Sequence, residues 1–200
     1  MDDLAVRLAH AQLKRMRGMV GYYHRRFFAD TRFVLLVGLA LVVAAAAVDE
    51  RLIALVAPVA LLGAAQTAFD ASYLTFARQY ARTLEDWLNG QAGVEVLVAA
   101  RMEDTYLYPL DRRKVVTIPA GAPTWFSLMT ALYTVLGIAA FAGGVVASIA
   151  VLDEAWLPWY LGVLGLLTLA VLGVGLWWFV GGVGERRLAE VLADVGSRRE

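Results

Sequence analysis

The sequence contains no cysteine and only 2 histidines in 200 residues. Without cysteine there can be no disulfide framework and no thiolate metal site. On a helix His10 and His24 would lie roughly 21 Å apart, which is too far for them to share a metal ion. A Walker loop, a nucleophile elbow, a dinucleotide fingerprint and a metal-binding histidine pair are also missing. We therefore expect no enzyme, with no catalytic residue, no metal and no cofactor.

Charged residues are missing from four long stretches, residues 33–48, 52–69, 125–152 and 156–183. A membrane-spanning helix needs about 20 apolar residues, within a range of about 17 to 25. The first stretch is slightly short and the third is long, and local thinning of the bilayer or tilting of the helix accommodates both. The sequence therefore predicts an all-α integral membrane protein with four transmembrane helices.

Basic residues are almost absent from the short loops at 49–51 and 153–155, because Arg51 is the only one of the 18 Lys and Arg residues found there. Cytoplasmic segments of membrane proteins carry an excess of Lys and Arg. Both termini are therefore predicted to be cytoplasmic (N-in, C-in). The richness in Ala, Val, Leu, Gly and Arg is typical of a high-GC bacterial proteome. We expect a multi-pass protein of a bacterial inner (cytoplasmic) membrane.

Two stripes of large side chains flank the first pair of spans, at alternating spacings of three and four residues. Because the loop between these spans is very short, the two striped helices should emerge side by side. The sequence predicts a cytoplasmic helical hairpin. The alternative is that one stripe forms a subunit contact. The predicted interface consists of Leu13, Met16, Val20, Tyr23, Phe27, Phe69, Tyr73, Phe76, Tyr80 and Trp87.

The chain divides into four predicted parts. Residues 1–92 hold the N-terminal cytoplasmic helix, the first two spans and the second cytoplasmic helix. Residues 93–123 form a small cytoplasmic segment, residues 124–184 hold the other two spans, and residues 185–200 form a short C-terminal cytoplasmic helix. In the second part 94–98 and 114–118 are β-branched, with Tyr106-Leu107-Tyr108 between them. We expect a β-ribbon of two or three strands there.

Polar side chains are few within or beside the spans. The candidates for a pore or polar lining are Gln66, Thr67, Asp70, Ser127, Thr130 and Thr134. The alternative is ordinary helix capping and interhelical hydrogen bonding. A separate set of small residues spaced by four, Ala140, Gly144 and Ser148, should let helix backbones approach closely, either within the chain or between subunits.

The layout of the first half, with a cytoplasmic helix, a tight two-span hairpin and a returning helix, resembles small bacterial two-span proteins of the pore-forming effector class. The likeness is architectural and implies a pore. We therefore expect a homo-oligomeric channel-like protein, because a single four-helix bundle is too narrow to hold a wet path. The alternative is a non-conducting membrane scaffold or accessory subunit that docks a cytoplasmic partner.

The expected partners are the lipid bilayer and further copies of the chain. The basic N-terminal helix is expected to contact anionic lipid, or alternatively only to enforce orientation. No nucleic-acid reading motif is present, and no nucleic acid is expected as a partner.

Overall fold

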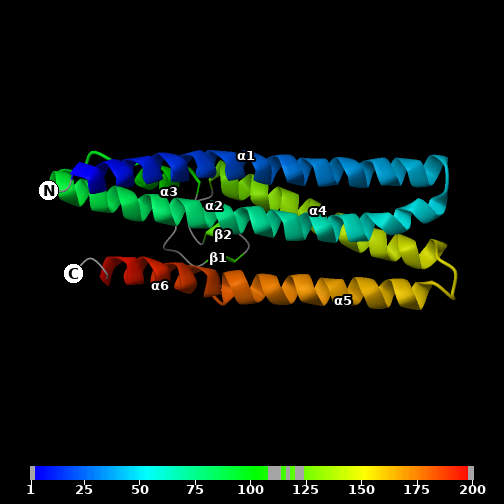
Figure 1. Cartoon of the computed structure of the whole chain (residues 1–200). Helices are drawn as coiled ribbons and strands as arrows, with labels where there is room; N and C mark the ends of the chain where they lie inside the picture. The colour runs from blue at the N-terminus through cyan, green and yellow to red at the C-terminus, as the bar shows by residue number, and fades with distance from the viewer. Residues whose placement is uncertain (1–2, 108–113, 116–117, 120–123, 198–200) are drawn as a thin grey trace. The chain divides into compact units, whose positions relative to one another are not determined.

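The computed structural model describes residues 3–107, 114–115, 118–119 and 124–197, which are almost entirely helical. The elements can be followed along the chain in Figure 1. They are α1 (Asp3–Ala47), the 3₁₀ helix η1 (Glu50–Leu55), α2 (Val56–Ala92), α3 (Ala99–Tyr106), β1 (Lys114–Val115), β2 (Ile118–Pro119), α4 (Trp125–Val151), α5 (Leu157–Gly175), the π-helix η2 (Leu176–Val180) and α6 (Val183–Ser197).

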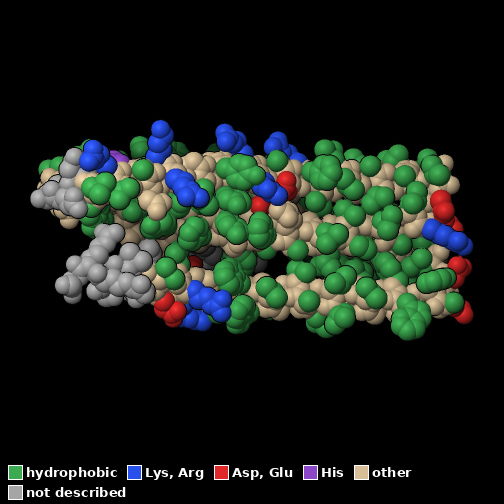
Figure 2. Space-filling model, in the orientation of Figure 1, with side chains coloured by type: hydrophobic (Ala, Val, Ile, Leu, Met, Phe, Trp, Pro, Cys, Tyr) green, Lys and Arg blue, Asp and Glu red, His purple; other side chains and the backbone are tan. Residues whose placement is uncertain are grey.

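Four helical segments are long and apolar enough to cross a membrane, which confirms the four predicted apolar helices by length and composition. They lie in Leu4–Ala47, Glu50–Ala92, Trp125–Val151 and Leu157–Val180. Large apolar side chains such as Phe33, Leu62 and Leu166 are exposed on them, each by more than 60%. Figure 2 shows one face of these segments covered by apolar side chains. Such surfaces fit a hydrocarbon solvent, because water would have to hydrate them at a high cost in free energy.

The chain folds as two compact units, and α1, α2 and α4 each contribute to both. Unit 1 comprises Met1–Arg26, Asp70–Thr130 and Gly182–Glu200, and unit 2 comprises Phe27–Phe69 and Ala131–Gly181. The core of unit 1 joins Leu13 and Met16 of α1 to Ala81 and Leu88 of α2. The core of unit 2 is formed by Ala57, Leu61 and Leu164 from α2 and α5, with Phe141 and Val145 of α4 packed against them.

Local signals explain where several helices begin and end. The Asp49 side chain accepts a hydrogen bond of 2.9 Å from the backbone N–H of Arg51, which is the capping contact that starts η1. Gly93 follows the last residue of α2 with a φ of 68°, and Gly182, with a φ of 63°, lies between Gly181, which caps η2, and the start of α6. Glycine tolerates this left-handed conformation at a helix C-terminus without a Cβ clash.

The β-ribbon predicted for residues 93–123 is not supported. Residues 94–98 form no strand, because the Asn89 side chain takes up the backbone N–H groups of Val96 and Leu97 and the carbonyl of Leu97. Residues 99–106 form the helix α3 instead. The described pairing is limited to two residues on each side, Lys114 with Pro119 and Val115 with Ile118. Tyr108, Val116 and Thr117 lie outside the described residues.

Candidate functional site

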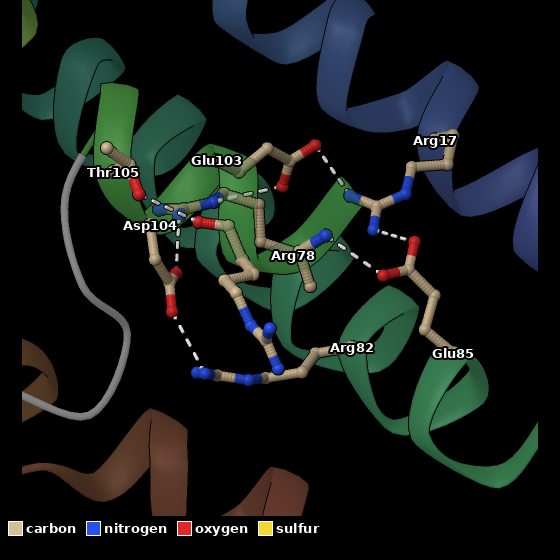
Figure 3. Close-up of polar contacts among 9 residues, drawn as sticks. Arg17, Arg78, Arg82, Glu85, Glu103, Asp104 and Thr105 are labelled. Atoms are coloured by element: carbon tan, nitrogen blue, oxygen red, sulfur yellow. Dashed lines mark hydrogen bonds and ion pairs between the residues drawn. The ribbon is translucent and has the colours of Figure 1, made fainter. Parts of the chain in front are cut away.

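Unit 1 contains a network of ion pairs that joins three helices (Figure 3). In it Arg17 of α1 contacts both Glu85 of α2 and, at 2.5 Å, Glu103 of α3. The other contacts run between α2 and α3. They are Arg78 Nε to Glu103 Oε2 at 3.3 Å, Arg78 Nη2 to Asp104 Oδ1 at 3.0 Å, and Arg82 Nη2 to Asp104 Oδ2 at 3.0 Å.

The sequence positions explain why these groups meet. Arg78, Arg82 and Glu85 are spaced by four and three, so they lie on one face of α2. Adjacent residues of a helix point in different directions, so Glu103 reaches α1 as well as α2, while Asp104 reaches only α2 in these contacts. Glu85 also accepts a hydrogen bond of 2.9 Å from the backbone N–H of Ala100, in the first turn of α3. A carboxylate is favourable there, since the N-terminal N–H groups of a helix lack intrahelical partners.

Burial makes this network important for stability. The side chain of Arg78 is fully buried and that of Glu85 is only 4% exposed. Three guanidinium groups face three carboxylates, so the cluster is neutral as a whole. A buried ion pair costs desolvation energy, and removing one partner leaves an uncompensated charge in the interior. The network therefore joins α1, α2 and α3 through contacts in which Arg17, Arg78, Glu103 and Asp104 each have two partners.

A second ionic contact, in which only the carboxylate is buried, lies closer in sequence to the spans. Asp70 of α2 is fully buried, and its Oδ1 lies 3.5 Å from Nε of Arg26 on α1. Arg26 also donates a hydrogen bond of 3.1 Å to the hydroxyl of Tyr22. On the same stretch of α1, Tyr23 stacks on Tyr73 with ring centroids 5.0 Å apart. These contacts add aromatic packing to the ionic join between α1 and α2 in unit 1.

His24 is a half-buried titratable group of unit 1, and it precedes the apolar stretch of α1. Its imidazole stacks on Phe126 of α4 with ring centroids 5.7 Å apart. Burial is the main cause that lowers the pKa of His24 below its usual value of 6.5, and the Arg78 guanidinium lowers it further, while the Glu103 carboxylate acts in the opposite direction. The folded protein therefore favours the neutral imidazole.

Acidification should destabilise unit 1 through His24. Because the pKa of His24 is lower in the folded state than in the unfolded state, the folded protein binds fewer protons. Its stability should fall as the pH drops from about 6.5 to the folded-state pKa. We expect His24→Gln to reduce the loss of Tm between about pH 7.5 and about pH 5.5 relative to the parent chain. His10→Gln, which changes an exposed histidine of the same helix, is the control, and an equal effect of both substitutions would contradict the assignment.

The six predicted lining residues are divided between the two units. Asp70, Ser127 and Thr130 are buried in unit 1, while Gln66, Thr67 and Thr134 are half-buried in unit 2. The hydroxyl of Thr130 donates to the carbonyl of Phe126 and that of Thr67 to the carbonyl of Gly63, at 2.8 and 2.7 Å. Such bonds run back along the residue's own helix.

The predicted packing residues of the third span lie against α2 and α5. Gly144 is buried, and a Cβ added there would lie 2.7 Å from the backbone nitrogen of Ala57. Ser148 is fully buried and its Oγ lies 3.2 Å from the hydroxyl of Tyr160. Ala140, the third member of the set, is half-buried.

The predicted hairpin residues are placed differently on the two helices. On α1, Leu13, Met16, Val20 and Phe27 are buried and Tyr23 is half-buried. On α2 the large aromatics lie to one side of the buried face: Tyr80 and Trp87 are half-buried against the unit 1 core, while Phe69, Tyr73 and Phe76 are exposed. The buried face of α2 in unit 1 carries Leu74, Ala77, Arg78, Ala81, Glu85 and Leu88.

The ion-pair network is the part of the site that sequence reasoning missed. In the sequence Glu85 and Glu103 each stand beside a second acidic residue, and Arg17 is one of several basic residues of the N-terminal helix. A signal was present, since Arg78 and Glu85 share a helix face with Leu74, Ala81 and Leu88. Charged residues within an apolar stripe indicate buried partners on a neighbouring element.

Comparisons of this chain with protein-family models, with curated proteins and with solved structures gave no match. The fold itself supports a coarse class, because four of its helices are long and apolar enough to span a membrane.

Proposed function

We propose that the chain is a non-conducting membrane scaffold, in which four spans anchor a helical platform, unit 1, that docks a partner protein. The observation that carries this proposal is the placement of polar side chains within the spans. In residues 33–48, 52–69, 125–152 and 156–183, no hydroxyl, amide or charged side chain is exposed. Ser127, Thr130 and Ser148 are buried inside their unit, and the others, such as Gln66, Thr67 and Thr134, are half-buried.

A channel would need a different surface. Because one four-helix bundle is too narrow for a wet path, the channel reading requires several copies with a polar lining between them. The exposed faces of the spans instead carry residues such as Leu36, Val135 and Leu166. A scaffold needs only an anchor that lipid can surround and a stable platform, which makes it the function that the geometry favours.

The platform combines a rigid interior with exposed apolar side chains outside the spans. The neutral ion-pair network joins its three helices. Val96, Met102 and Tyr106 are exposed by 68%, 59% and 75%, on α3 and the segment before it. Exposed apolar groups outside a bilayer are typical of protein interaction surfaces. These observations support a docking role for the α2–α3 end of unit 1.

The proposal places both termini in the cytoplasm of a bacterium and the spans in its inner membrane, on the strength of the Lys and Arg distribution. The proposal includes two further partners. The first is another copy of the chain. The second is anionic lipid or another acidic surface, which is supported by Lys14, Arg15 and Arg25, because these side chains are exposed on α1.

The scaffold proposal predicts that purified protein reconstituted in liposomes produces no flux of potassium, chloride or protons above that of empty liposomes. Liposomes with gramicidin serve as the positive control for the assay. A subunit count by native mass spectrometry of the same preparation shows whether an assembled oligomer was tested. Flux that rises with the protein-to-lipid ratio would contradict the scaffold and favour the channel.

The absence of native cysteine makes a topology test direct, because a single introduced cysteine is the only thiol in the chain. In intact spheroplasts a membrane-impermeant maleimide should label the Asp153→Cys variant. It should label the Lys14→Cys variant only after the membrane is permeabilised. Labelling in the reverse order would overturn the proposed orientation.

A further inference from the structure

A proline near the start of α2 removes one hydrogen-bond donor from a buried turn. Ala54 belongs to the 3₁₀ helix η1, and residue 58 lies in the first turn of α2. Where the chain passes into the α-helix, the α-helical donor for the carbonyl of residue 54 would be the N–H of residue 58. Residue 58 is proline, which has no N–H. Ala54 is only 7% exposed and lies within the apolar stretch 52–69. In hydrocarbon a carbonyl without a donor is costly, so a proline is tolerated where another group supplies one.

The donor that the structure supplies comes from a different helix. The hydroxyl of Tyr160 on α5 donates a hydrogen bond of 2.8 Å to the carbonyl oxygen of Ala54. Because a phenol has a single proton, its oxygen then remains free to accept. Ser148 of α4, which is fully buried, places its Oγ 3.2 Å from that oxygen. Ala54, Pro58, Ser148 and Tyr160 all belong to unit 2.

The backbones of α2 and α4 approach closely at the same turn. A Cβ at Gly144 would lie 2.7 Å from the backbone nitrogen of Ala57 and 3.2 Å from the Cβ of Val56. Ser148 Oγ lies 2.6 Å from the carbonyl oxygen of Gly144. The start of α2 is thus held by α4 through packing and by α5 through a hydrogen bond.

We propose that the Tyr160 hydroxyl replaces the amide that Pro58 lacks, and so locks the junction of η1 and α2 to α5. A proline break is a natural hinge, since one rung of the helical ladder is missing. When the hydroxyl donates to the Ala54 carbonyl, this carbonyl has a hydrogen-bond donor and the first turn of α2 is held in place. Without it the first turn of α2 can open. This conformational lock ties the α1–α2 pair of spans to α5, and it does so whether the protein is a scaffold or a channel.

A simpler role for Tyr160 is that of an aromatic anchor near the end of a span. That role depends on the ring and on a polar hydroxyl, and it has no relation to Pro58. The two roles therefore differ in whether the effect of removing the hydroxyl depends on residue 58.

A double-mutant cycle on the full chain, purified in detergent, separates them. Tyr160→Phe should lower the Tm by about 2–4 °C. In a Pro58→Ala background, where the alanine N–H can donate to the Ala54 carbonyl, the same substitution should cost less than half as much. Two results would overturn the proposal. One is that Tyr160→Phe does not lower the Tm of the chain that keeps Pro58, and the other is that in the Pro58→Ala background it lowers the Tm by half of that loss or more. If Tyr160→Phe does not fold alone, the Pro58→Ala background must restore folding, and failure to do so counts against the lock.

Hydrogen exchange provides a second measurement that does not depend on the Pro58→Ala variant. Tyr160→Phe should speed amide exchange about tenfold in residues 55–62, with little change elsewhere in α2. Tyr133→Phe is the matched control, because it removes a tyrosine hydroxyl from α4 for which the described residues offer no hydrogen bond. Equal exchange in the parent and the Tyr160→Phe variant, or equal effects of the two variants, would overturn the lock.

Discussion

Replacing Arg78 by methionine is expected to lower the free energy of unfolding of unit 1 by about 3–5 kcal/mol. Methionine keeps most of the volume of the arginine stem but removes the charge that faces Glu103 and Asp104 at 3.3 and 3.0 Å. Glu103 keeps its contact with Arg17, and Asp104 keeps its contact with Arg82. Three carboxylates then face two guanidinium groups, however, and the fully buried position loses its charge. A fall in Tm on the order of 10 °C corresponds to this loss.

The burial of the arginine should determine the size of the effect. Arg78 is fully buried, Arg82 is 36% exposed, and Arg101, which pairs with Glu95, is 70% exposed. Arg82→Gln leaves Asp104 with its contact to Arg78, and Arg101→Gln breaks a surface pair that contributes at most about 1 kcal/mol. We expect losses of Tm in the order Arg78, Arg82, Arg101. Limited proteolysis at α3 should follow the same order. Equal losses for Arg78→Met and Arg101→Gln would show that the network does not stabilise the unit.

The spans were predictable because hydrocarbon imposes a simple rule on sequence. A charged side chain within a span is expensive, so its absence over 16 or more residues marks the segment directly. Each of the four charge-free stretches lies largely within one of the four long apolar helical segments. The start of η1 also has a local signal, because Asp49 is a residue type that caps helices and its side chain accepts from the backbone N–H of Arg51.

The α2–α3 region was less predictable because its structure depends on contacts between distant residues. The valine-rich residues 94–98 favour a strand by propensity. In the fold, however, the Asn89 side chain bonds the backbone that a neighbouring strand would have paired, and Leu97 packs on the unit 1 core. Glu103 and Asp104 look like a solvated pair until Arg17 and Arg78 are known to face them. Propensity describes one residue at a time, whereas these outcomes are set by tertiary partners.

The aromatic residues of α2 show a related limit of pattern reasoning. Their alternating spacing of three and four residues predicts that they lie on one face of the helix. It does not predict whether that face is the one that contacts α1. In unit 1 the most deeply buried positions of α2 are small or aliphatic, with Leu74, Ala77 and Ala81 at 1%, 0% and 0% exposure. Small side chains let helices approach closely, and larger rings then fit along the edges of the contact.

Two neighbouring sets of small residues lie along α4, and their spacing alone does not say which of them packs against another helix of the chain. Two adjacent glycines, one from each set, allow a direct comparison. Gly144 belongs to the set Ala140, Gly144 and Ser148, and Gly143 belongs to a neighbouring set with the same spacing, Ala139, Gly143 and Ala147. A Cβ at Gly144 would lie 2.7 Å from the backbone nitrogen of Ala57, whereas a Cβ at Gly143 would meet no atom within 4 Å. An added methyl group should therefore destabilise the protein at residue 144 but not at residue 143.

Gly144→Ala is expected to destabilise unit 2 by about 1–3 kcal/mol, because the clash is with backbone and one helix must move away from the other. Gly143→Ala should instead be neutral or stabilise the protein by up to about 1 kcal/mol, since alanine has the better helix propensity and open space around it. Thermal unfolding of the two variants in the same detergent measures the difference. A loss of Tm at Gly143 as large as that at Gly144 would mean that the set containing Gly143 is also covered, and a second copy of the chain would then be the natural occupant of that face.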